Sequence, residues 1–315
     1  MFEKDVILKK VLSDKENFAD LINTVVYDGK EMVSPEQLVD MPEETDMILS
    51  DKNNKWKTVS RYRDILAKAT FDTKYVIFAC ENQSEIHYAM VIRNMLYDAL
   101  SYSTQVQNTE KKNRRNKEKM KRGEFLSGLK KTDKLIPVVT LVLYYAEQEW
   151  DGELDLYSML DMEKENSETL KKYIPNYHIN FINARKIDDP EQFKSGLREL
   201  FGILKYESDE AALKEFVQRH RDRCQNMDED IYMALTILLG EQNRLIEMNP
   251  NEMEGGKRNM CKAFDQIEQK GIEKGEERVN ILNRVLAQEK RIDDLIRATE
   301  DQSYQKQLFI KYGIS

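Results

Sequence analysis

Residues 59–83 constrain the fold of this chain most strongly, because they read as two β-strands joined by a short turn at Asp72. The second strand contains an unbroken apolar run from Tyr75 to Cys80 and ends in a carboxylate, Glu81. Such a run is typical of a strand buried on both faces of a sheet. We therefore expect a sheet in which a buried strand ends in charged side chains.

The turn determines which side chains meet. Folding the two strands about their turn places Asp64 opposite residues 79–81, and two carboxylates at one level repel each other unless they share a cation or hold a proton. Gln83 lies two positions beyond Glu81 and hence on the same face. Mg²⁺ needs only one or two protein carboxylates, since water and substrate phosphate complete its ligands. Asp64 and Glu81 are therefore candidate metal ligands, with the backbone carbonyl beyond Glu81 as a further one. Gln83 could orient an attacking water, because an amide cannot act as a general base.

A structural explanation is open for the same residues. A carboxylate at the end of a buried strand can mark the point where the chain leaves the core. Asp64, flanked by Arg61 and Arg63, can be ion-paired at the surface. On spacing alone, this structural explanation is the simpler one.

The composition excludes several classes of protein. The formal net charge of −8 argues against a uniformly basic DNA-coating protein, but not against a local DNA-binding patch. The three cysteines lack metal-ligand spacing, so we expect reduced thiols and neither a zinc site nor a disulfide framework. The first residues do not resemble a signal peptide, and no apolar run is long enough to span a membrane. We expect a cytoplasmic protein that binds no membrane.

Hydrophobic periodicity predicts the order of elements. We expect a helix over residues 5–26 with Asp5 as its N-cap, a short strand at 47–49, a helix over 86–104, and strands over 136–145 and 177–182. From residue 208 onward no strand signal remains, and the expected helices cover 208–224, 228–248, 258–290 and 292–312. This loss of strand signals predicts an α/β domain over residues 1–205 and a helical region over 206–315.

A basic tract interrupts the predicted domain at residues 110–131, with ten Lys or Arg against three Glu. It is the best candidate for contact with the DNA backbone, through Lys111, Lys112, Arg114, Arg115, Lys117, Lys119, Lys121 and Arg122. The alternative is a solvated, charged loop, which charge runs commonly form. At the end of the tract, Phe125 and Leu126 are expected to anchor it to the body of the protein.

Several motifs, in order along the chain, resemble the PD-(D/E)XK nuclease superfamily and, within it, the Rpn-type recombination-promoting nucleases, which are also described as transposases. Five matches fall within residues 5–152, and the repetitive tail of the family is matched further on. The matching segments are residues 5–12, 61–66, 81–84, 90–97, 135–144 with 150–152, and 271–275. In the segment 81–84, Gln83 stands where the superfamily has a lysine, and the family shows the same replacement.

The resemblance implies a restriction-endonuclease-like α/β fold, a mixed central sheet flanked by helices and followed by an all-helical C-terminal region. It implies a Mg²⁺-dependent DNA endonuclease that promotes recombination, with Mn²⁺ or Ca²⁺ as alternative ions. Asp64 and Glu81 become metal ligands, and Gln83 becomes the residue that orients water. Asp5 is a candidate for a further acid, or an N-cap.

Arg93 and Tyr97 lie one helical turn apart and are expected near the site, with Arg93 contacting phosphate or an acidic neighbour. We expect DNA as partner, self-association through the C-terminal helices, and no small-molecule substrate. Two alternatives stay open: a DNA-binding or assembly protein that keeps the nuclease fold but does not turn over, and a helical scaffold acting through residues 208–315.

Overall fold

The structure is a computed structural model that describes residues 2–41, 44–50, 56–62, 64–71, 74–116, 119–240 and 257–314. A five-stranded sheet in the order β1-β4-β5-β6-β7 lies at its centre. The strands are β1 (Leu38–Asp40), β4 (Ile65–Phe71), β5 (Lys74–Gln83), β6 (Val138–Tyr144) and β7 (Asn180–Asn183). β1, β4 and β5 pair antiparallel, whereas β5, β6 and β7 pair parallel.

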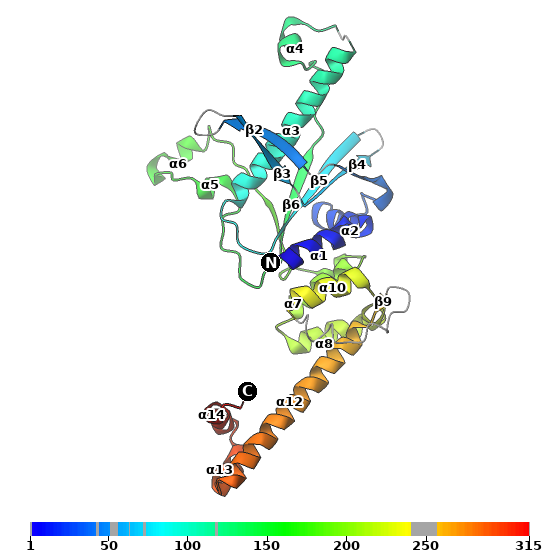
Figure 1. The fold of residues 1–315 in the computed structure, drawn as a ribbon. Coiled ribbons are helices and arrows are strands. Elements are labelled where there is room, and N and C mark those ends of the chain that lie inside the picture. Colours follow the sequence, from blue (N-terminus) through cyan, green and yellow to red (C-terminus); the bar gives the residue numbers. More distant parts are fainter. Residues whose placement is uncertain are drawn as a thin grey trace.

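Helices cover both faces of this sheet (Figure 1). One face packs against α1 (Phe2–Ser13), α2 (Lys15–Val26), α7 (Leu197–Tyr206) and α10 (Glu229–Leu238). The other face of β6 packs against the start of α3 (Met90–Arg115), where Val142 contacts Met90 and Val91. Burial on both sides explains why β6 is apolar except for Thr140, whose hydroxyl donates a hydrogen bond to Asp98. The mixed sheet with flanking helices confirms the expected restriction-endonuclease-like α/β class.

The first strand of the predicted pair is in fact two strands. Residues 56–62 form β3 (Trp56–Tyr62), which pairs with β2 (Glu44–Ser50) in a separate two-stranded sheet. The predicted strand at 47–49 is therefore the middle of a longer one. Asp64 lies between β3 and β4, immediately before the strand that pairs with β5. The predicted turn at Asp72 lies outside the described residues.

Two helix predictions need correction. The helix expected over 5–26 is divided at Asp14, whose carboxylate accepts hydrogen bonds from the backbone N–H groups of Glu16 and Asn17 and so begins a second helix. Asp5 lies inside α1 and is not an N-cap. The helix expected over 86–104 begins at Met90 and continues to Arg115, and the basic side chains in its last turn interact favourably with the helix dipole.

The C-terminal region contains α8 (Glu210–Arg219), α9 (Arg221–Gln225), α12 (Met260–Gln288), α13 (Ile292–Glu300) and α14 (Gln302–Tyr312). It is not purely helical, since β8 (Met227–Asp228) pairs with β9 (Lys257–Arg258). Most of the predicted helix over 228–248 beyond α10 lies outside the described residues. The remaining elements are η1 (Pro35–Gln37), α4 (Arg122–Ser127), α5 (Leu156–Met159), α6 (Lys164–Leu170) and η2 (Pro190–Gln192).

The main core continues across the predicted boundary at residue 205. Phe216 of α8, Cys224 of α9 and Met260 of α12 belong to the same buried cluster as Leu8 and Phe78. By contrast, α12 extends away from the body, and α13 and α14 lie at its far end (Figure 1), where they pack around a small cluster of their own. The division at 205 and self-association through these helices stay predictions.

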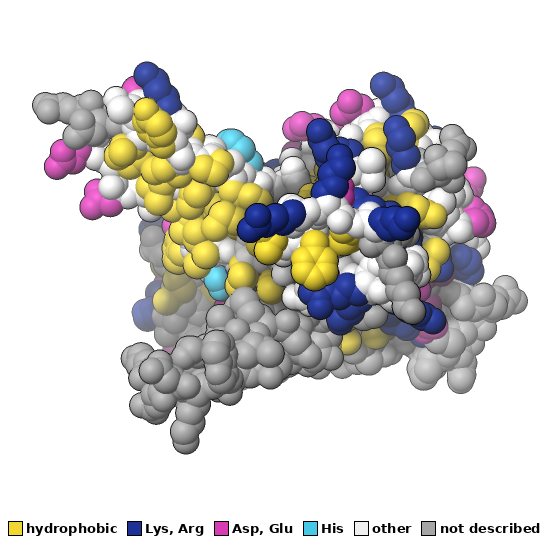
Figure 2. All heavy atoms as spheres, turned by 90° about the horizontal axis from the view of Figure 1, so that it is seen from above, with side chains coloured by type: hydrophobic (Ala, Val, Ile, Leu, Met, Phe, Trp, Pro, Cys, Tyr) yellow, Lys and Arg dark blue, Asp and Glu magenta, His cyan; other side chains and the backbone are white. Residues whose placement is uncertain are grey.

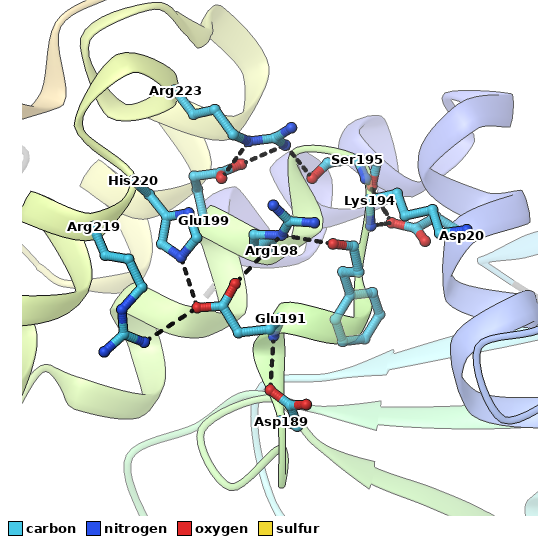
Figure 3. A network of polar contacts seen from close by, with 11 residues as sticks. Asp20, Asp189, Glu191, Lys194, Ser195, Arg198, Glu199, Arg219, His220 and Arg223 are labelled. Atoms are coloured by element: carbon cyan, nitrogen blue, oxygen red, sulfur yellow. Dashed lines mark hydrogen bonds and ion pairs between the residues drawn. The ribbon is translucent and has the colours of Figure 1, made fainter.

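A buried polar network joins α9 to α2 and α7 (Figure 3). The Asp20 carboxylate accepts hydrogen bonds from the backbone N–H groups of Lys194 and Ser195, at 2.9 and 2.8 Å, and from the Ser195 hydroxyl at 2.7 Å. The Arg223 guanidinium donates to the Ser195 carbonyl at 2.7 Å and to both carboxylate oxygens of Glu199. Because each buried charge has a partner, the network fastens the helices without leaving an uncompensated carboxylate.

Replacing Gly202 with alanine tests the packing of α8 on the core. A Cβ atom at Gly202 of α7 would lie 2.0 Å from the Phe216 ring, so one of the two helices must move. We expect Gly202→Ala to lower the free energy of unfolding by about 1–3 kcal/mol in urea titrations. Gly275→Ala is the control, because nothing lies within 4 Å of that position, and it should not destabilise the protein. Equal stability of the two variants would contradict this packing.

Candidate functional site

The β4–β5 pairing brings Asp64 and Glu81 to the same level of the sheet. Ile65 pairs with Cys80, so the next position along each strand places Asp64 beside Glu81. The Asp64 Oδ2 atom accepts a hydrogen bond of 2.7 Å from the backbone N–H of Asn82, which fixes the carboxylate against the end of β5. The sequence-based expectation that these two carboxylates meet is therefore correct, although Asp64 precedes its strand instead of lying in it.

Glu81 is completely buried, and its charge is compensated by Arg93 from the first turn of α3. The distance between Arg93 Nη2 and Glu81 Oε2 is 3.3 Å. Arg93 Nε in turn donates a 3.1 Å hydrogen bond to the hydroxyl of Tyr97, one helical turn further on. Of the two roles expected for Arg93, the structure contains the ion pair with an acidic neighbour. A buried carboxylate requires such a partner, because an isolated charge in the interior is strongly destabilising.

The electrostatic environment raises the pKa of Asp64 above its usual value. Burial is the main cause, and the nearby Asp5 carboxylate adds to it. The Asn82 N–H and the charges of Arg93 and Lys9 act in the opposite direction but do not cancel it. Burial lowers the pKa of Arg93, but the Glu81 carboxylate and Tyr97 outweigh this effect and leave it raised. Ionisation of Asp64 thus depends on the neighbouring cations.

Helix α1 contributes Asp5 and Lys9 to the surroundings of the two carboxylates. The hydroxyl of Tyr145, directly after β6, donates a short hydrogen bond to the carboxylate of Asp5. Burial and Asp5 raise the pKa of Tyr145 far above its usual range, so this hydroxyl keeps its proton. Lys9 lies one helical turn after Asp5, and its charge acts on Asp64. The sequence analysis did not identify Lys9 or Tyr145. The i, i+4 spacing of Asp5 and Lys9 is a signal that could have pointed to the lysine.

Gln83 lies at the end of β5 and is largely buried. Its side-chain Nε2 donates a 2.9 Å hydrogen bond to the backbone carbonyl of Asn82. Two other amides nearby are buried without such partners in the described part of the chain: Nδ2 of Asn82, and both side-chain polar atoms of Asn94, the residue after Arg93. Buried polar groups in this state are what bound water or a hydrated ion would satisfy.

The donor set fits an ion that keeps much of its hydration. Asp64 and Glu81 supply two carboxylates, which is what Mg²⁺ requires from a protein when phosphate and water complete its octahedron. Within the described residues, no three Asp, Glu, His or Cys side chains come together to enclose a metal. The arrangement thus suits an open Mg²⁺ site better than a closed structural one. Cys80 is fully buried beside the two carboxylates, and burial raises the pKa of its thiol well above the usual range, so it is not a reactive ligand.

The basic tract does not lie beside the carboxylates. Lys111, Lys112, Arg114 and Arg115 belong to the last turns of α3, so the end of the helix lies about 33 Å from Arg93 at 1.5 Å per residue. Helix α3 projects beyond the sheet and carries α4 at its tip (Figure 1). We call residues 110–134 the basic arm. Of the expected contact residues, Lys119, Lys121 and Arg122 lie at its tip, and Lys117 lies outside the described residues.

The expectation that Phe125 and Leu126 anchor the arm is wrong. Their side chains are 75% and 79% exposed. Seen from the end of the molecule that carries α4, Lys and Arg side chains gather around exposed apolar ones (Figure 2). In the described part of the chain, no helix is both long and apolar enough to cross a membrane.

Neutralising Asp64 tests the raised pKa of this residue. A raised carboxyl pKa means that ionisation is more costly in the folded protein, so Asp64→Asn should increase the melting temperature in EDTA above that pKa. Asparagine can still accept the Asn82 hydrogen bond. The gain should disappear as the pH falls through the raised pKa towards about 3.9, where both states are protonated.

Asp133 provides the opposite control, because hydrogen bonds from Asn113 and the Lys130 N–H lower its pKa. Asp133→Asn should therefore decrease the melting temperature at neutral pH. If Asp64→Asn also decreased the melting temperature, Asp64 would instead be ionised and held in a stabilising ion pair at the surface.

Comparison with known proteins places this site in a family. A family model described as "Putative transposase, YhgA-like" matches residues 3–230, which is more than half of the chain and includes every element of the candidate site. The searches of curated proteins and of solved structures found no match. The match confirms the resemblance to the Rpn-type family and supports a transposase or nuclease-like role. The chain belongs to the YhgA-like transposase family.

Proposed function

We propose that this protein is a metal-dependent DNA endonuclease that hydrolyses phosphodiester bonds and promotes recombination. The observation that carries the proposal is the meeting of Asp64 and Glu81 across the β4–β5 pair, with Arg93 as counter-charge. A hard divalent cation bound there would activate water and neutralise charge on the scissile phosphate. A carboxylate pair at the end of a central strand is therefore suited to phosphodiester hydrolysis.

Each side chain of the site would have its own role in the reaction. Asp64 and Glu81 would hold Mg²⁺, and the hydrogen bond from Asn82 keeps the Asp64 carboxylate in place. Gln83 would release the Asn82 carbonyl and orient the attacking water through its amide. Arg93 is about one third exposed, so its guanidinium can leave Glu81 and donate to a substrate phosphate oxygen. Tyr97 positions Arg93 through its hydroxyl.

Lys9 would supply the cation that the strand motif lacks. The position of the usual lysine is occupied by Gln83, which carries no charge. The Lys9 ammonium acts on Asp64 from α1 and is held one helical turn from Asp5. A positive charge at this point can stabilise the negative charge that develops on the phosphate in the transition state.

A binding protein without turnover is the alternative, and one observation favours it. Arg93 compensates Glu81 within the protein itself, so the pocket does not need a metal to be electrostatically stable. Such a protein would bind DNA in a salt-dependent manner, would not nick it, and would bind equally well after Asp64→Ala.

Plasmid nicking tests the proposed activity. We expect supercoiled DNA to be nicked in Mg²⁺ and to remain intact in EDTA. Asp64→Ala and Glu81→Gln should each reduce the rate by at least about 100-fold, because each removes a ligand charge. Asp151→Ala is a control on an exposed carboxylate that hydrogen-bonds only weakly to Tyr88, at 3.4 Å. Nicking that persists in EDTA or in Asp64→Ala would refute the assignment.

Neighbouring lysines test the role of α1. Lys9→Ala should lower the nicking rate about 100-fold, since a positioned charge at the site contributes to the transition state. Lys10→Ala is the matched control, because Lys10 points away and pairs with Asp230 at 2.6 Å. It should leave nicking unchanged. Equal rates for both variants and the unmodified protein would exclude Lys9 from the reaction.

A further inference from the structure

We propose that the tip of the basic arm is a DNA wedge, in which Phe125 and Leu126 enter the base stack of duplex DNA about one helical turn from the cut. The inference relies on the proposed function for its partner, duplex DNA. It adds a second contact, remote from the carboxylates, that would deform the substrate. Its basis is the exposure, the rigid support and the charge of the tip.

The two apolar side chains at the tip are large and mostly exposed. Phe125 and Leu126 are adjacent in α4 and each is at least three quarters exposed. The apolar surface of a pair of large side chains at a projecting tip has no role in the core of this chain. Contiguous exposed apolar groups of this kind commonly mark a binding surface.

The tip is held in place by its own hydrogen bonds. The Glu124 carboxylate accepts from the backbone N–H groups of Lys121 and Lys131, both at 2.9 Å. Gly128 ends α4 with a φ of +71°, and its carbonyl accepts a 3.0 Å hydrogen bond from the side chain of Asn113 in α3. These bonds join α4 to the end of α3, so the apolar pair is presented by a supported turn.

The positive charge of the basic arm indicates a partner with a negatively charged backbone. Its described residues include ten cations: Lys111, Lys112, Arg114, Arg115, Lys119, Lys121, Arg122, Lys130, Lys131 and Lys134. Its three described carboxylates are all engaged within the arm, because Glu110 pairs with Arg114, Glu124 caps α4, and Asp133 accepts from Asn113 and Lys130. The outward field is therefore positive, which complements a phosphate backbone.

Apolar side chains surrounded by cations match a known way of deforming DNA. Proteins that insert Phe, Leu or similar residues between base steps unstack those steps and bend the duplex by about 20–90°, while nearby cations hold the phosphates. Arg122 lies three and four residues before Phe125 and Leu126, so it shares their side of α4. It is placed to hold a phosphate next to the opened step.

The length of α3 sets the spacing between the two contacts. About 33 Å separates Arg93 from the end of the helix. One turn of B-DNA spans about 34–36 Å, or roughly ten base pairs. A duplex lying along α3 would thus present the same side to the carboxylates and to α4. The opened step should lie about ten base pairs from the scissile phosphate.

The experiment uses the full chain in EDTA, so that bending is measured without cleavage. A 30-base-pair duplex carries fluorophores at its two ends, and energy transfer reports its bend. Permanganate reactivity maps unstacked thymines, and nicks made after addition of Mg²⁺ map the cut on the same duplex. The double variant Phe125→Ser/Leu126→Ser is compared with Tyr173→Ser, which replaces an apolar side chain that is 82% exposed on the body.

We expect the unmodified protein and Tyr173→Ser to bend the duplex and to expose thymines about ten base pairs from the nick. The double variant should lose both effects but keep the salt dependence of binding, because the cations remain. Equal bending by the double variant would overturn the wedge and leave the proposed function intact. Binding of the tip to anionic vesicles with no DNA bending would also overturn it. Absence of DNA binding by the unmodified protein would instead refute the DNA partner, and with it the proposed function.

Discussion

The antiparallel pairing of β4 with β5 is the constraint on which the rest of the site depends. Its register places Ile65 opposite Cys80, and the next pair of positions therefore brings together Asp64 and Glu81. A shift by one residue would turn one of the two carboxylates to the opposite face of the sheet. The hydrogen bond from Asn82 to Asp64 reinforces this register at the end of the strand. Secondary structure thus sets the distance between the two groups before any side chain contributes.

The surrounding helices supply charges that partly compensate the Asp64 and Glu81 carboxylates. Glu81 has no exposure to solvent, and Arg93 from α3 supplies the charge it requires. Asp64 keeps a raised pKa because burial outweighs the cations near it. Two partly compensated carboxylates in the interior cost stability, which is a common property of sites kept for function. Helix α3 therefore has two roles, since its first turn neutralises the pocket and its last turns carry the basic arm.

The sequence was sufficient to predict the parts of the fold that depend on local periodicity. The apolar run of β5, the strands β6 and β7, and the meeting of Asp64 with Glu81 follow from strand length and turn position. The pairing of β2 with β3 was missed, because a separate two-stranded sheet depends on contacts that strand periodicity does not encode. Asp5 was assigned as an N-cap because it directly precedes the apolar residues that repeat at helical spacing, yet α1 begins at Phe2.

Contacts between residues far apart in the chain could not be predicted from the sequence. Tyr145 contacts Asp5 across 140 positions, and nothing in the local pattern of either segment indicates this. The distance between the arm and the carboxylates was also missed, because it depends on α3 continuing to Arg115. Exposure of Phe125 and Leu126 could not be read from composition, since apolar residues at the end of a charged tract usually pack on the body.

The location of a bound cation tests the central claim most directly. Crystals of the protein soaked in Mn²⁺ and measured at the manganese absorption edge would locate the ion by its anomalous scattering. The account predicts a peak between the carboxylates of Asp64 and Glu81, about 2.0–2.3 Å from an oxygen of each, with Arg93 displaced from Glu81. A pocket without a peak, in which Arg93 still pairs with Glu81 at saturating Mn²⁺, would contradict it.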